Sequence, residues 1–194
     1  GIAELAQKVV NEFYRNPDKP KGKGVQVSIS VASFVPKPFT PFQWEAQDTI
    51  DELISKQNHL LSSVKTKKIS VSYHKVNISF LEGVMARGDR KLCAVLLKAH
   101  EKGFKFDAWD EFFDYEKWLS VFERSGIDPA FFANRQMGLD EVLPWDVIDC
   151  GVSKEFFKRE RERAYAAATT PNCREKCAGC GANKYGEGVC FEKC

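Results

Sequence analysis

The chain has 194 residues, 43% of them hydrophobic, which is typical of one globular domain with room for a small appendage. Its 29 basic and 27 acidic side chains nearly cancel, so charge does not indicate a nucleic-acid partner, although it does not exclude one. No apolar run approaches the roughly 20 residues that span a bilayer, and the first residues lack the order of a signal peptide. We therefore expect a cytoplasmic protein with no membrane partner.

The first third of the chain alternates between helical and strand periods. Apolar side chains recur at helical spacing over 2–13, with no capping residue before them, and then alternate over 25–34 as in a strand. Helical spacing returns over about 45–63, and strand spacing over 69–73. This order predicts an α/β protein with a parallel sheet, and the abrupt start suggests a piece of a longer protein. Because two strands alone make a marginal sheet, either the helices complete an α+β core or further strands lie outside this chain.

The remaining sequence is mainly helical. A helical turn broken at 87–89 precedes predicted helices over about 90–100 and 115–124, a short helix near Asp128, and a charged helix capped by Ser153. Five aromatic residues have the helical spacing of a buried stripe, and we expect them in the core. They are Trp109, Phe112, Phe113, Trp118 and Phe122.

A proline-rich loop follows the first predicted strand. Pro36, Pro38 and Pro41 exclude helix and ladder pairing and stiffen an extended segment. Ligands of α/β folds bind beside the carboxyl ends of strands, so the start of this loop is a candidate cofactor site. Its residues are Phe34, Val35, Pro36 and Lys37. A rigid structural crossover is the alternative.

Acidic and basic side chains surround the glycine at position 88. Glu82, Arg87, Asp89 and Arg90 could form an anion site or a buried ion-pair network, and a solvated helix junction is the simpler interpretation. His74 could act as a base or a ligand, although a structural role is the simpler interpretation there too.

Five of the seven cysteines fall in the last 22 residues. Cys173, Cys177 and Cys180 have C-x3-C-x2-C spacing, and Cys190 and Cys194 follow. Four thiolates in a short loop suit tetrahedral zinc or an iron–sulfur cluster, and unligated or disulfide-bonded cysteines are the alternative. We predict a metal site with Cys173, Cys177, Cys180 and Cys190 as ligands, Cys194 being a rival for the fourth position.

The same spacing holds the catalytic four-iron cluster of radical S-adenosylmethionine enzymes. Two features argue against that role here. The position before the third cysteine, usually aromatic in those enzymes, is Gly179, and only 14 residues follow Cys180, where a whole barrel would have to follow.

Five segments follow one another along the chain: SVASFVPKPFTPFQW, FLEGVMARGDRKL, FDAWDEFFDYEKW, LPWDVIDCGVSKEFFKRERERA and TTPNCREKCAGCG. In this order they resemble the carboxyl-terminal part of the radical S-adenosylmethionine domain in a family of bacterial proteins with an amino-terminal B12-binding-like domain. The similarity covers essentially the whole chain.

The resemblance implies a fold and a division of the chain. Residues 1–150 would be the carboxyl-terminal piece of a partial (β/α)6 barrel with added helices, 151–168 a charged connecting helix, and 169–194 a Cys-rich metal-binding tail. The loop 35–43 would border the nucleotide or substrate cleft. The family's catalytic cluster motif would lie upstream of Gly1, and the three clustered cysteines match its second cysteine group. The family places a fourth cysteine directly after the Cys-Gly pair, whereas nine residues separate Cys180 from Cys190 here.

The resemblance also implies a reaction for the full-length protein. S-adenosylmethionine would be cleaved reductively at a four-iron cluster, and hydrogen would be abstracted from a substrate that stays unknown, with cobalamin as a further candidate cofactor. The chain alone would be inactive, and its first partner would be the missing amino-terminal part of the same polypeptide. The alternative is a non-enzymatic zinc-knuckle module that binds RNA or a protein through Lys158, Arg159, Arg161 and Arg163.

Overall fold

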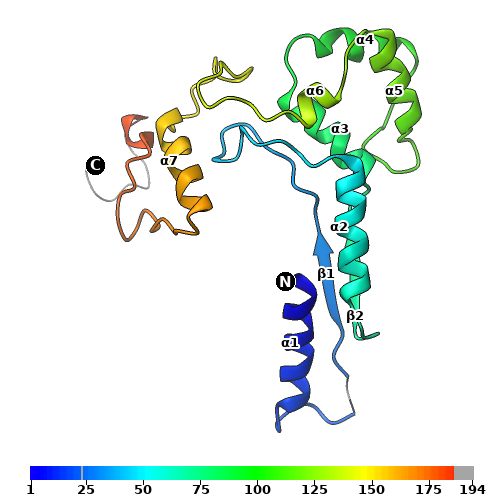
Figure 1. The fold of residues 1–194 in the computed structure, drawn as a ribbon, viewed down its shortest axis with the longest axis vertical. Coiled ribbons are helices and arrows are strands. Elements are labelled where there is room, and N and C mark those ends of the chain that lie inside the picture. Colours follow the sequence, from blue (N-terminus) through cyan, green and yellow to red (C-terminus); the bar gives the residue numbers. More distant parts are fainter. Residues whose placement is uncertain (23, 186–194) are drawn as a thin grey trace. The chain divides into compact units, whose positions relative to one another are not determined.

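The computed structural model describes residues 1–22 and 24–185, and Figure 1 shows the course of the chain. The chain forms two compact units. The first contains residues 1–35 and 48–81, and the second contains residues 36–47 and 82–194. This division follows packing, and the domain boundaries expected at 150 and 168 stay a prediction.

The first unit contains two complete helices, a two-stranded parallel sheet and the beginning of a third helix. Its elements are α1 (Ile2–Arg15), β1 (Val27–Val31), α2 (Ile50–Ser63) and β2 (Ile69–Tyr73). Val27 lies opposite Ile69 and Val31 opposite Tyr73, so the carboxyl ends of both parallel strands lie at the same end of the sheet. Parallel strands need a long crossover, and α2 is the helix of that crossover, capped by Thr49, whose side chain accepts a hydrogen bond from the Glu52 amide.

The two faces of this sheet differ in chemistry. Val27, Ile29 and Ile69 pack against Ala6 and Val10 of α1. The alternate positions carry four exposed serines, and the Ser70 hydroxyl lies 3.1 Å from that of Ser28. These serines are Ser28, Ser30, Ser70 and Ser72. In the part of the chain that is described, neither strand has a second neighbour, so both outer edges of the sheet are open.

Helix α1 is apolar over a wider arc than the sheet covers. Ala6 and Val10 are buried, whereas Ile2, Leu5 and Val9 expose between 48% and 65% of their surface. The helical stripe expected from the sequence is present, but Ile2, Leu5 and Val9 are not part of the core of this unit.

The second unit is mostly helical. It contains the end of α3 (Val76–Arg87), then α4 (Leu92–Glu101), α5 (Tyr115–Arg124), α6 (Ala130–Ala133), α7 (Lys154–Tyr165) and the short 3-10 helix η1 (Ala182–Tyr185). Helices α4 and α5 contact each other and bury Val95, Val121 and Phe122. Across residues 1–22 and 24–185, no helix combines the length and apolar character that crossing a membrane requires.

Arg87 is the central polar residue of the second unit. Its side chain is fully buried, and its guanidinium donates hydrogen bonds to the carbonyl oxygens of Phe132 (2.7 Å), Ala133 (2.6 Å) and Arg135 (2.6 Å). Burial, with a smaller effect from Arg135, lowers the pKa of Arg87 to about 10, so it stays a cation at neutral pH. The guanidinium therefore fixes α6 and the turn after it to the end of α3.

A second cluster joins distant parts of this unit. Trp44 is fully buried among Met137, Leu143, Trp145 and Phe157, which come from the loop before α7 and from α7 itself. The backbone amide of Met137 donates to the Trp44 carbonyl at 2.8 Å. The proline-rich loop is therefore anchored by its aromatic end.

The predicted elements are present, and two of them are shorter than expected. The first strand is 27–31 and not 25–34, and the helix after the proline-rich loop begins at Ile50 and not near 45. The predicted burial of Trp109 and Phe112 is wrong, because both lie in turns before α5 and are more than half exposed. Trp118 and Phe122 are buried, since they lie on one face of α5 itself.

The four charged residues around Gly88 do not form one group. Arg87 is buried, Glu82 pairs with Lys37, the Asp89 carboxylate accepts from the Lys91 amide at 2.8 Å, and Arg90 is exposed. A shared anion site at this junction is therefore not formed.

We expect Arg87→Met to destabilise the second unit by about 2–4 kcal/mol, because three buried carbonyl oxygens lose a charged donor. Unfolding in urea, followed by tryptophan fluorescence, measures this loss, and all four tryptophans belong to this unit. The matched control is Arg90→Met on the exposed side, which should stay within about 0.5 kcal/mol of the parent. Equal stability of the two variants would contradict the role assigned to Arg87.

Candidate functional site

The four predicted cofactor-binding residues have different environments. Phe34 and Val35 end the first segment of the first unit, and Pro36 and Lys37 begin the second unit. Phe34 is 47% exposed, whereas Pro36 is fully buried. The Lys37 ammonium forms an ion pair with Glu82, and both side chains are about half exposed.

A cavity of about 420 Å³ lies in the first unit at the carboxyl ends of the two strands. Val31 to Phe34 line it together with Tyr73, the first turn of α1 and one side of α2. Its polar groups include His59 and the ion pair between Lys56 and Asp48 (2.5 Å). The position agrees with the usual ligand position in α/β folds, and Phe34 is the predicted residue that reaches it.

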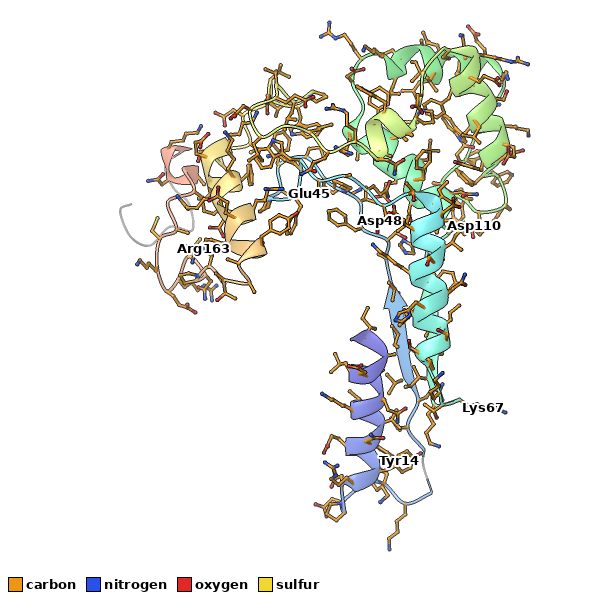
Figure 2. All side chains as sticks on the ribbon, viewed as in Figure 1. Tyr14, Glu45, Asp48, Lys67, Asp110 and Arg163 are labelled. Atoms are coloured by element: carbon orange, nitrogen blue, oxygen red, sulfur yellow. The ribbon has the colours of Figure 1, made fainter. Side chains whose placement is uncertain are left out.

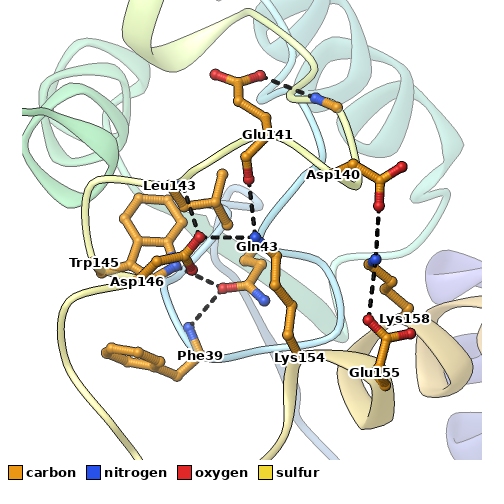
Figure 3. Close-up of polar contacts among 11 residues, drawn as sticks. Phe39, Gln43, Asp140, Glu141, Leu143, Trp145, Asp146, Lys154, Glu155 and Lys158 are labelled. Atoms are coloured by element: carbon orange, nitrogen blue, oxygen red, sulfur yellow. Dashed lines mark hydrogen bonds and ion pairs between the residues drawn. The ribbon is translucent and has the colours of Figure 1, made fainter.

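The second half of the proline-rich loop is organised by Gln43, which the sequence did not single out. The Gln43 side-chain oxygen accepts hydrogen bonds from the Phe39 amide (3.1 Å) and from the Trp145 indole nitrogen (2.7 Å), as Figure 3 shows. Phe39 has a positive φ of 57°, which a non-glycine residue adopts only when its surroundings hold it there. Gln43 is 97% buried, so it fixes both the loop and the indole.

Lys154 at the start of α7 holds the segment that carries Trp145. Its ammonium donates to the Asp146 carboxylate (2.7 Å) and to the Glu141 carbonyl (2.9 Å). The same oxygen of Asp146 accepts from the Leu143 amide at 2.9 Å. The turn 143–146 is thereby closed on itself and attached to the helix.

The Glu141 carboxylate supports this segment from the other side. It accepts two hydrogen bonds from Arg135, at 2.8 and 2.9 Å, and one from the Gly138 amide at 3.1 Å. The hydrogen bond from Arg135 lowers the pKa of Glu141, so the carboxylate is charged well below neutral pH.

The basic side chains of α7 have partners within the chain. Lys158 binds Asp140 (2.9 Å) and Glu155 (3.2 Å), and Arg161 binds Glu45 (2.5 Å), which Figure 2 labels on the loop beside α7. Arg159 donates to the Ala178 carbonyl and Arg163 to the Thr169 carbonyl. The four cations considered for nucleic-acid binding are thus used to fix neighbouring loops.

The Cys-rich tail is described as far as residue 185. Cys173 and Cys180 are free thiols, and Cys177 is in a disulfide. The Gly179 amide donates to the Cys177 sulfur at 3.3 Å, and Gly179 and Gly181 have the positive φ values that a tight turn around a cysteine cluster requires. Cys190 and Cys194 lie outside the described residues. No group of three or more metal-binding side chains gathers within the described ranges.

The remaining sequence candidate, His74, is exposed, and its backbone carbonyl accepts from the Gln57 side chain at 3.1 Å. The residues that sequence reasoning missed, Gln43 and Lys154, carry no periodic signal because they lie at a loop end and a helix start. Both nevertheless fall inside the quoted segments SVASFVPKPFTPFQW and LPWDVIDCGVSKEFFKRERERA.

No protein-family model and no solved structure matches the chain. It is similar to an uncharacterized protein of Methanocaldococcus jannaschii, with 27% identity over 127 residues. The match covers 66% of this chain but only 28% of that relative, so it spans little more than a quarter of the relative's length.

We expect Glu141→Gln to reduce the free energy of unfolding at neutral pH by about 1 kcal/mol, because the neutral glutamine side chain cannot form the ion pair with Arg135. A carboxylate with a lowered pKa stabilises the folded state above its unfolded pKa, about 4.3, and this contribution is lost as pH falls through the folded value. The difference between parent and variant should therefore shrink below about pH 4 in urea titrations. A difference that is equal at pH 7 and pH 3 would contradict this assignment. Glu155→Gln, at a carboxylate whose side chain is 79% exposed, is the control.

Proposed function

We propose that this chain is the carboxyl-terminal part of a radical S-adenosylmethionine domain from a cytosolic enzyme of unknown substrate. The observation that carries the proposal is the parallel pairing of β1 with β2 through α2, with no further strand beside either of them in the described part of the chain. A (β/α) barrel is built from such strand–helix–strand units. Other α/β folds use them too, and the resemblance of the five quoted segments selects this one.

The packing of the second unit brings parts of the quoted segments together. Trp44 from the first segment contacts Leu143, Trp145 and Phe157 from the fourth, and Arg87 from the second segment is fully buried. Residues from the first, second and fourth segments therefore contribute to the core of this unit, which supports a resemblance of fold more directly than one of chemistry.

In the full-length protein the cluster would supply the electron that cleaves S-adenosylmethionine, and its ligands would come from outside this chain. The contribution of this chain would be to orient a bound molecule and to exclude water. The cavity beside Phe34 and Tyr73, at the carboxyl ends of both strands, is the surface suited to that task.

We further propose that the tail holds zinc or an auxiliary iron–sulfur cluster through Cys173, Cys177 and Cys180, with Cys190 as fourth ligand. The glycine turns and the hydrogen bond from the Gly179 amide to the Cys177 sulfur support a loop that binds metal through its cysteines. The disulfide at Cys177 and a metal bond to its thiolate are alternative states of the same sulfur.

The zinc-knuckle alternative needs exposed cations for RNA. Lys158 and Arg161 have side chains only 20% and 16% exposed and are already paired with carboxylates. This observation favours the enzyme fragment over the RNA-binding module.

Metal analysis with the absorption spectrum, on chain purified without air, tests the tail. We expect about one zinc per chain without colour, or about four irons with a brown colour. Cys180→Ser should lower the metal content severalfold, and Cys93→Ser, at an exposed thiol outside the tail, should leave it unchanged. Metal-free protein after anaerobic purification and reconstitution would refute the tail site.

The fragment proposal is tested by the reaction itself. Under reducing conditions with S-adenosylmethionine, the isolated chain is expected to form no 5'-deoxyadenosine, because its one C-x3-C-x2-C group is the tail. Chromatography of the quenched mixture measures the product, and sustained formation above a no-protein control would sink the proposal.

A further inference from the structure

We infer that the second unit contains a small-molecule site, independent of the proposed radical chemistry, that binds an organic carboxylate through the side-chain amide of Gln43. The site is a cavity of about 500 Å³ where the proline-rich loop, the segment 146–153 and the first turn of α7 meet. This volume lies within the range of small-molecule pockets in proteins.

Gln43 gives the strongest indication of a ligand. Both partners of its side-chain oxygen are nitrogen donors, so the amide cannot be turned over without losing two hydrogen bonds. The amide nitrogen must then lie on the opposite side, and Figure 3 shows it directed away from Trp145. Gln43 lines the cavity, and over the described residues its amide nitrogen has no hydrogen-bond partner. Gln43 is 97% buried as a residue and its amide nitrogen faces the cavity, so an acceptor oxygen of a ligand bound there would supply the missing hydrogen bond.

The charged groups around the cavity are paired with one another. Asp146 already accepts from Lys154 and the Leu143 amide, and Asp149 accepts from Lys184 (2.7 Å) and the Gly151 amide (2.9 Å). The two carboxylates are therefore neutralised by two ammonium groups. A positive electrostatic potential comes in addition from the helix dipole at the amino-terminal end of the 12-residue helix α7, and it favours a negative group of a ligand near the first turn.

The rest of the cavity wall is apolar. Phe39, Ile148, Val152 and Phe157 line it. Phe39 reaches the wall from a backbone with positive φ whose amide is held by Gln43, so the same residue that offers the free donor also fixes the aromatic wall. An apolar body with one carboxylate matches this combination, and benzoate is a simple probe of that class.

The experiment is a benzoate titration of the full chain, followed by the side-chain NH₂ signals of Gln43 in a proton–nitrogen correlation spectrum. Saturable movement of these signals is expected, and benzyl alcohol, which has the ring without the charge, should bind at least severalfold more weakly. Signals of Gln43 that stay unmoved at tens of millimolar benzoate, or equal affinity for the alcohol, would overturn the inference.

Gln43→Glu supplies the matched variant. It keeps an oxygen for Phe39 and Trp145 and replaces the free NH₂ by a second oxygen, so benzoate affinity should fall by roughly tenfold or more. Gln136→Glu introduces the same charge at an exposed position of the same unit and should bind as the parent does. Unchanged affinity in Gln43→Glu would also overturn the inference. If that variant fails to fold, the titration of the parent protein decides the question alone.

Discussion

The second unit depends on one buried cation. Arg87 ends α3, and its guanidinium donates hydrogen bonds to the carbonyl oxygens of Phe132, Ala133 and Arg135, in and just after α6. Helix α6 has only four residues and could not be stable by itself. The amide of Gln47 donates to Ala133 in the same turn, so the end of the proline-rich loop is attached to the same place. A single charged residue thereby sets the position of a loop, a short helix and the segment that leads to Trp145.

The charged side chains of α7 mainly hold neighbouring loops in place. Lys154, Lys158 and Arg161 could be taken from the sequence as a cationic helix face, yet each binds a carboxylate of a neighbouring loop. In an irregular region, where backbone groups lack the regular partners of helices and sheets, side chains must supply the hydrogen bonds. Charge on a helix is therefore weak evidence for a nucleic-acid partner when acidic loops pack beside it.

How far the sequence predicts this protein depends on periodicity. The strand 69–73 and the helix 115–124 were predicted at their observed limits, because alternation and helical spacing report local geometry directly. Trp109 and Phe112 were misplaced because turns have no period that assigns a face. The importance of Gln43 depends on Trp145, 102 residues away, and no local pattern encodes such a pair. Phe34 lines a cavity of the first unit and Pro36 is fully buried, and the ligand roles expected for both stay predictions.

The interleaving of the two units bears on how the chain folds during synthesis. The first unit is complete in sequence once residue 81 has been made, but residues 36–47 belong to the second unit and are excluded from its packing. The packing partners of Trp44, which are Leu143, Trp145 and Phe157, are synthesised much later. Arg161, the partner of Glu45, follows it by 116 residues. The loop therefore stays without its apolar partners until most of the second unit has left the ribosome, and contacts of this sequence separation form slowly. Its three prolines hinder this unpacked segment from forming β-strand hydrogen bonds with other chains, which would otherwise promote aggregation.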